Sequence, residues 1–183
     1  MKVKTISILM LATSIIMTSC GNGSTQTTNE TEVATTSSVA KLDIFNDINK
    51  TRQSLSENGI GSLGEWKSDQ MGGFFSITNY FQFGGGTMQN NIAYYLESED
   101  ESYIQTAKLT LNINNKSEKK QALTKFKDLT TATFKSLSLE IPKELIESIN
   151  AEKEFESSNN TFSASVKLDK NKIDTWTLKI TTK

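Results

Sequence analysis

The sequence contains no histidine, one cysteine and one proline among its 183 residues. The missing histidine removes the most common general base near neutral pH and the most common zinc ligand. It also removes the Ser–His and Cys–His pairs of nucleophilic catalysis. Positive and negative charges nearly balance, at a formal net charge of −1, so no basic surface for nucleic acid is indicated. We therefore expect no metal site and no cofactor, and we predict that the protein is not an enzyme.

The apolar segment at the start of the chain is too short to cross a membrane. It extends from Ile6 to Met17, follows Lys2 and Lys4, and gives way to small polar residues. Spanning about 30 Å of hydrocarbon takes about 20 apolar residues. A charged start, a short apolar segment and a small-residue end are instead typical of an export signal. We predict that this segment is removed on export.

The only cysteine stands directly after this segment, in the sequence Met17-Thr18-Ser19-Cys20. An apolar residue, two small residues and a cysteine resemble the lipobox of bacterial lipoproteins. The resemblance implies that Cys20 receives a diacylglycerol, that the signal at 1–19 is cut off before it, and that the new amino terminus is acylated. Each buried methylene contributes about 0.8 kcal/mol, so two or three acyl chains would hold the protein on a membrane. The alternative is a secretory signal followed by an incidental free cysteine.

The same resemblance implies an address in the cell envelope. In enteric lipoproteins an Asp directly after the cysteine favours retention in the inner membrane, and Gly21 stands there instead. We therefore expect an outer-membrane location facing the periplasm if the cell has two membranes. The inner membrane and the cell surface are the alternatives.

Residues 21–40 are rich in Ser and Thr and poor in large apolar side chains. Such a segment cannot bury enough surface to offset the entropy lost on ordering it. The chain is therefore predicted to consist of a signal at 1–19, the lipidated Cys20 with a flexible tether at 20–40, and one folded domain at 41–183. About 140 residues is a common size for a single domain.

Periodicity within residues 41–183 predicts both helices and strands. Apolar residues at helical spacing predict one helix from near Leu42 to Gly59, a long helix at 117–136 and a short helix from Pro142 to Ile149. Alternation of apolar and polar residues predicts strands at 63–67, 75–83, 91–96, 103–113, near 155, at 162–168 and at 176–180. This order indicates an α+β domain: an antiparallel sheet of about six or seven strands, packed with two longer helices and one short helix.

One predicted strand is dense in aromatic residues. Four apolar side chains alternate from Phe75 to Phe83 and predict a single strand with these side chains on one face. Phe74 and Tyr80 would then lie on the opposite face. We therefore expect this strand to be covered on both faces, either as the middle strand of a sandwich or with one face forming a binding groove.

Three polar motifs invite a chemical interpretation, but each fits a structural one better. The acidic run Glu97–Glu101 lacks the alternating acids and central glycine of an EF-hand loop. Ser117 and Lys120 have the Ser-x-x-Lys spacing of penicillin-binding enzymes without their companion motifs. The glycines at 84–86 are not followed by the Lys and Ser/Thr of a phosphate loop. We predict a solvated loop, a helix start and a turn, respectively.

Aromatic side chains also suggest where a partner could bind. Such residues are enriched at interfaces, so a possible interaction surface consists of Trp66, Phe74, Tyr80, Tyr95 and Tyr103. The alternative is that these residues belong to the core.

The sequence alone specifies no reaction. The leading hypothesis is a membrane-anchored envelope lipoprotein whose non-catalytic domain binds a protein or another envelope ligand. The first alternative is a carboxylate-dependent hydrolase acting on glycans, which needs two acids converging in a cleft, one of them with a raised pKa. The second is an immunity-type lipoprotein that neutralises a toxin, which needs a strongly acidic or apolar docking face.

Overall fold

The computed structural model describes residues 42–183. The predicted signal, Cys20 and the tether lie outside the described residues. Within them the chain forms two helices, five strands, a 3-10 turn, two further helices and three further strands. Their bounds are α1 Asp43–Asn46, α2 Ile48–Ser56, β1 Lys67–Ser68, β2 Phe74–Ile77, β3 Phe81–Phe83, β4 Asn90–Ser98, β5 Thr106–Ile113, η1 Lys116–Glu118, α3 Lys119–Ser136, α4 Leu145–Asn150, β6 Phe155–Ser158, β7 Phe162–Asp169 and β8 Asp174–Thr182.

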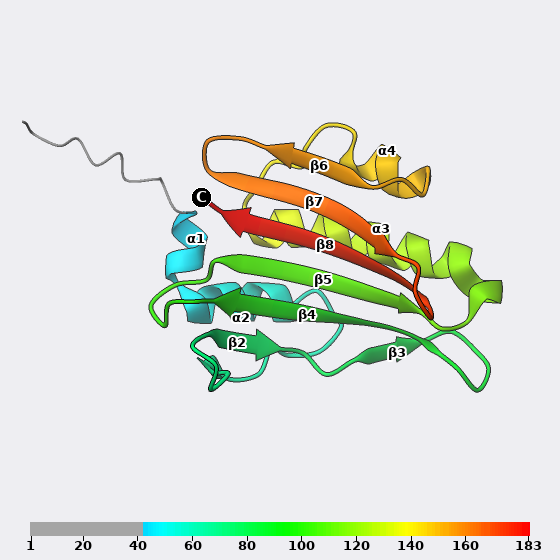
Figure 1. Cartoon of the computed structure of the whole chain (residues 1–183), viewed down its shortest axis with the longest axis horizontal. Coiled ribbons are helices and arrows are strands. Elements are labelled where there is room, and N and C mark those ends of the chain that lie inside the picture. The colour runs from blue at the N-terminus through cyan, green and yellow to red at the C-terminus, as the bar shows by residue number, and fades with distance from the viewer. Residues whose placement is uncertain (1–41) are drawn as a thin grey trace, which may run out of the picture. The chain divides into compact units, whose positions relative to one another are not determined.

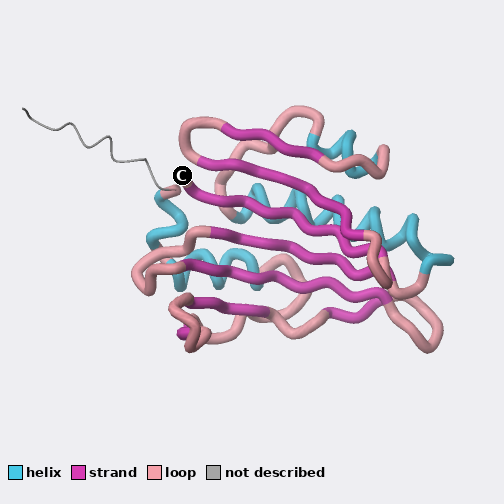
Figure 2. Tube along the Cα trace, in the orientation of Figure 1, coloured by secondary structure: helices cyan, strands magenta, loops and turns pink. Residues whose placement is uncertain are grey.

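All described strands belong to one 8-stranded antiparallel sheet. Its order is β1-β2-β4-β5-β8-β7-β6, and β3 pairs with β4 beyond the end of β2 (Figure 1). The helices lie together on one side of the sheet, behind it in Figures 1 and 2. The predicted α+β fold is therefore confirmed, with one more strand than the upper expected number.

The core lies between the sheet and α3. Phe126, Thr130 and Phe134 of this 18-residue helix are buried, because residues four positions apart share one face of a helix. Trp176 of β8 is 0% exposed, and its ring centroid lies 6.5 Å from that of Phe126. Packing on α3 thus fixes which face of the central strands is buried.

The predicted first helix is in fact two helices, α1 and α2. Asp47 between them has φ −104° and ψ 86°, which is not helical. Its carboxylate accepts a hydrogen bond from the backbone N–H of Lys50 at 2.9 Å and caps α2, a role that Asp fills well. Gly59 follows α2 with a φ of +79°, as expected for a residue after a helix.

The predicted short helix also begins later than expected. Helix α4 starts at Leu145 and not at Pro142. Glu144, directly before it, has a φ of 74°, which a continuous helix from the proline would not allow.

The prediction of a single strand at 75–83 is wrong. In β2 Phe75 pairs with Glu97, whereas in β3 Phe81 pairs with Ile92. Successive side chains of β4 point to opposite faces of the sheet, so the two halves of the segment place their aromatic rings on opposite faces. Phe81 packs against the core, and Phe75 faces away from the helices. The segment is therefore not one central strand covered on both sides.

The glycine run forms the turn between β3 and β4, and the start of α3 holds it in place. The carboxylate of Glu118 accepts hydrogen bonds from the backbone N–H of Gly85 at 3.0 and 3.1 Å. Gly84 has a φ of +86°, and a Cβ at this position would collide with the same carboxylate. The backbone conformation therefore favours glycine here, and a larger residue would also have to displace the Glu118 carboxylate from Gly85.

Candidate functional site: the open face of the sheet

The side of the sheet that points away from the helices is the candidate site, and we call it the open face. No helix or strand of residues 42–183 covers it (Figure 1). Alternation along each strand places every second side chain there. Its members on the four central strands are Asn91, Ala93, Tyr95 and Glu97 of β4, Thr106, Lys108, Thr110 and Asn112 of β5, Thr175, Thr177, Lys179 and Thr181 of β8, and Ser163, Ser165, Lys167 and Asp169 of β7.

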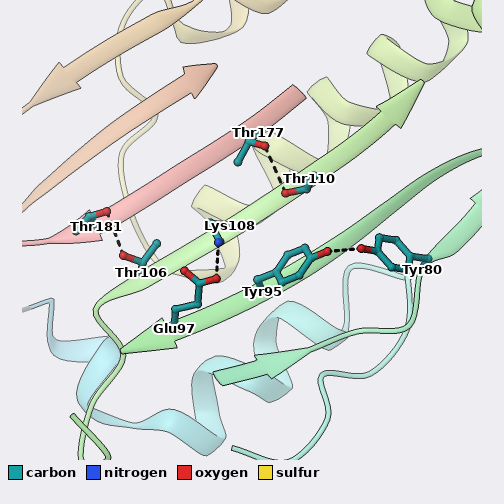
Figure 3. Close-up of polar contacts among 8 residues, drawn as sticks. All are labelled: Tyr80, Tyr95, Glu97, Thr106, Lys108, Thr110, Thr177 and Thr181. Carbon is teal, nitrogen blue, oxygen red and sulfur yellow. Dashed lines mark hydrogen bonds and ion pairs between the residues drawn. The ribbon is translucent and has the colours of Figure 1, made fainter. Parts of the chain in front are cut away.

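Hydrogen bonds between neighbouring strands order these hydroxyl and amide groups. The hydroxyl oxygens of Thr106 and Thr181 lie 3.3 Å apart (Figure 3). Each hydroxyl offers one donor and two acceptor sites; Thr106 is only 7% exposed, so the half-buried Thr181 is the member of the pair that keeps sites for a ligand. Three more contacts of this kind join Thr110 with Thr177 at 3.5 Å, Asn112 Nδ2 with Asn91 Oδ1 at 2.9 Å, and Thr175 Oγ1 with Asn112 Oδ1 at 3.0 Å.

The lysines of the open face differ in whether an acid neutralises them. Lys108 forms an ion pair with Glu97 (Figure 3), and Lys167 pairs with Glu156 of β6 at 3.2 Å. Lys179 lies directly opposite Lys108 in the ladder and is exposed. It forms no ion pair within residues 42–183. Like charges directly opposite each other destabilise a sheet, but the ion pair with Glu97 already offsets the charge of Lys108, so Lys179 is the cation of this pair that no acid balances.

A second exposed cation stands at the β1 edge of the open face. Lys67 pairs in register with Phe75, and its Nζ lies 5.5 Å from the centroid of that ring. No acid of the described chain forms an ion pair with Lys67. The open face therefore carries two cations, Lys67 and Lys179, without an anionic partner from residues 42–183.

Two tyrosines meet at strand β4 of the open face, Tyr95 on the strand and Tyr80 in the segment between β2 and β3. The hydroxyl oxygens of Tyr80 and Tyr95 are 2.6 Å apart (Figure 3). Burial is the main cause that raises the pKa of Tyr95, followed by the hydrogen bond and charge of Tyr80 and then by the charge of Glu97. Tyr95 thus stays a neutral hydroxyl under physiological conditions. The Nζ of Lys108 lies 5.3 Å from the centroid of its ring, so the ring also contacts a cation.

A shallow hollow opens where the β1–β2 loop meets β4 and β5. Its lining includes the rings of Phe75 and Tyr95, the carboxylate of Glu97 and the hydroxyl of Thr106. Met71, at the tip of the loop, also lines it and is 92% exposed. Flat rings, hydrogen-bonding groups and three acids, Asp69, Glu97 and Glu99, therefore come together at this end of the open face.

Asp69 shapes the loop beside this hollow. Its carboxylate accepts hydrogen bonds from the backbone N–H groups of Met71 at 2.7 Å and Gly73 at 2.9 Å. These bonds favour the charged form and lower the pKa of Asp69. Asp69 is thus an ionised turn former and not a proton donor.

The structure divides the five aromatic residues that the sequence grouped as a possible interaction surface. Tyr95 lies on the open face, and Tyr80 contacts its hydroxyl from the segment between β2 and β3. Trp66 and Phe74 stack on each other, with centroids 6.3 Å apart, and Trp66 packs against the core. Tyr103 lies in the loop between β4 and β5. Only the pair of tyrosines therefore belongs to the candidate site.

Sequence reasoning missed the ladder of hydroxyls and lysines. Polar residues at every second position of 106–112 and 175–181 predict two strands, each with one wet face. Nothing in that pattern says that the two strands are neighbours. Their register, Thr106 opposite Thr181 and Lys108 opposite Lys179, exists only in the folded sheet.

Metal sites and membrane-spanning helices are the other functional features to consider in residues 42–183. Residues 42–183 contain no cluster of three potential metal ligands, and none of their helices has the length and apolar character needed to span a bilayer. The carboxylate of Asp100, in the acidic run, accepts hydrogen bonds from the backbone N–H and hydroxyl of Ser102 at 2.8 and 2.7 Å and closes the β4–β5 loop.

No protein-family model, curated protein or solved structure matches this chain. The argument for its function therefore starts from the geometry of the open face.

Proposed function

We propose that this protein is a lipid-anchored envelope lipoprotein whose domain binds an envelope partner, without catalysis, through the open face. The observation that carries this proposal is an ordered polar network on a sheet face that no element of residues 42–183 covers. Lipidation of Cys20 and an outer-membrane position facing the periplasm belong to the same proposal. Their support is the sequence pattern Met17–Cys20 followed by Gly21.

Three properties of the open face favour recognition over a surface that is merely solvated. Its hydroxyl and amide groups are fixed by rigid strands and cross-strand hydrogen bonds, so binding would order few additional side chains. The rings of Phe75 and Tyr95 lie in a hollow beside them. Finally, Lys179 is an exposed cation that no acid of residues 42–183 neutralises.

The two alternative functions receive less support from the described residues. A glycan hydrolase needs a carboxylic acid that holds its proton, and Asp69 in the hollow has a lowered pKa. An immunity protein needs a strongly acidic or apolar docking face, whereas the open face mixes hydroxyls, amides and charges of both signs. We therefore favour binding of an envelope component.

Site-specific photocrosslinking in the native membrane tests the open face directly. A benzophenone amino acid replaces Thr177 at the centre of the open face, and the control replaces Thr131, an exposed residue of α3 in the helical layer. We expect a discrete adduct from position 177 and none from position 131. Adducts from position 131 alone, or from neither position, would overturn the proposed function.

The anchor is tested separately by Cys20→Ala. We expect the wild-type chain to enter the detergent phase on phase separation, and the Cys20→Ala chain to remain in the aqueous phase or to keep its uncleaved signal. Mass spectrometry of the mature wild-type chain should show acyl groups on residue 20. An unmodified thiol at that position would remove the anchor from the proposal.

A further inference from the structure

We infer that the open face binds an acidic glycan strand that runs across the β-strands from Lys67 towards Lys179. The inference rests on the proposed function and names the class of ligand for the same face. It follows from the positions of two cations, from the groups between them and from the kinds of ligand that this surface does not suit.

The two cations without acidic partners define the ends of the path. Lys67 lies on β1 and Lys179 on β8, with β2, β4 and β5 between them in the sheet. Neighbouring strands are about 4.8 Å apart, so four strand intervals separate the two lysines by roughly 19 Å. One small molecule cannot contact both. A polymer with negative charges along its length can.

The groups between the two lysines suit a polyhydroxylated ligand. In register from the β1 edge, Lys67 is followed by Phe75, Glu97, Thr106 and Thr181. The ring of Phe75 offers a flat apolar surface, and the hydroxyl of Thr181 offers both a donor and acceptors. Sugar rings present the matching combination of an apolar face and a rim of hydroxyl groups.

The neighbouring row of residues across the sheet offers similar groups and ends at Lys179 on β8. It consists of Ile77, Tyr95, Lys108 and Lys179. Tyr95 contributes a second ring to the hollow together with a neutral hydroxyl. Glu97 already neutralises Lys108, so the cation available to an acidic sugar in this row is Lys179.

Other polymers fit this surface less well. Nucleic acid binding requires several lysines or arginines along a phosphate backbone, and only two cations of this path are without an acidic partner within residues 42–183. Peptides that bind sheets add to an exposed strand edge, or insert apolar anchors into pockets. The middle of the open face instead presents hydroxyl and amide groups on paired strands. A carboxylated glycan combines the few charges and many hydroxyls that this surface matches.

Binding of matched glycan probes to the full-length lipidated chain in nanodiscs tests the inference. The probes are oligomers of polygalacturonate, alginate and hyaluronan, and peptidoglycan glycan strands freed of their peptides, all of which carry carboxylates. Methyl-esterified polygalacturonate supplies the same sugar backbone without charge. Biolayer interferometry at two salt concentrations measures each affinity. We expect at least one carboxylated probe to bind, more weakly at higher salt. Esterification of that probe should lower its affinity severalfold.

Three lysine variants locate the binding site. Lys67→Gln and Lys179→Gln should each lower the affinity for the carboxylated probe about two- to fivefold, as expected for loss of one exposed charge contact. They should leave any residual affinity for the esterified probe unchanged. Lys135→Gln, on the exposed surface of α3, is the matched control and should have no effect. Circular dichroism confirms that each variant is folded.

Three results would overturn the inference: no binding of any carboxylated probe, equal affinity for the charged and esterified forms, or an equal effect of the control variant. If photocrosslinking at position 177 captures a protein while none of the glycans binds, the ligand class is wrong and the open face remains the binding site. If position 177 gives no adduct, the proposed function itself fails.

Discussion

Replacing the buried Tyr94 by Phe tests the polar contact that joins the sheet to α3. Tyr94 is 0% exposed, and its hydroxyl oxygen lies 2.7 Å from the hydroxyl of Thr133 and 2.9 Å from Nδ2 of Asn58. Thr133 donates its own proton to the carbonyl of Leu129 at 2.6 Å. The Tyr94 hydroxyl therefore donates to Thr133 and accepts from Asn58, so both of its partners depend on it.

The expected cost of Tyr94→Phe follows from what the partners lose. Leaving a buried polar group without a partner costs about 1–3 kcal/mol. Thr133 keeps its bond to Leu129, and Asn58 is only partly buried, so we expect the lower half of that range, about 1.5 kcal/mol. For a domain of this size, each kcal/mol lowers the melting temperature by about 3 °C.

A double-mutant cycle separates the hydrogen bond from other effects of the substitution. Urea unfolding, followed by fluorescence of Trp66 and Trp176, is measured for Tyr94→Phe, Thr133→Val and the double variant. We expect the double variant to be about 1 kcal/mol more stable than the sum of the single losses predicts, because it leaves no Tyr–Thr partner unpaired. Tyr80→Phe, at an exposed tyrosine, is the control and should cost less than about 0.5 kcal/mol. Additive losses, or a cost of Tyr94→Phe no larger than that of the control, would refute the network.

Three further predictions concern pH, a turn and a helix cap. Burial raises the pKa of Tyr94 above the ordinary tyrosine value of 10.0, so the unfolded chain releases this proton first as pH rises. The contribution of this tyrosine to the free energy of unfolding is therefore complete below pH 10 and is lost as pH rises above it. In urea unfolding, Tyr94→Phe should lose less stability than wild type between pH 10 and 11. Gly84→Ala should cost more than Gly59→Ala in thermal unfolding, although both glycines have positive φ, because only Gly84 faces Glu118; equal losses would contradict this. Asp47→Ala should cost about 1 kcal/mol by removing the cap of α2, and Asp47→Asn should recover most of it.

The sequence by itself determined the fold class and most of the elements. Alternation of apolar and polar residues is a local property, so it identified the central strands and their wet faces, for example at 106–112. Helical spacing similarly identified α3. The local pattern did not reveal the break at Asp47. The apolar residues keep helical spacing on both sides of it, and an Asp can either lie inside a helix or cap the start of a new one.

Only the tertiary structure decided which strands are neighbours and which faces their side chains share. Phe75 and Phe81 have the same alternation in sequence, yet their pairing with different positions of β4 places them on opposite faces. The juxtaposition of Lys108 with Lys179, and of Thr106 with Thr181, likewise depends on the β5–β8 register. That register joins strands more than 60 residues apart along the chain, and packing against α3 selects it. The candidate site arises from this long-range pairing, which no local pattern in the sequence contains.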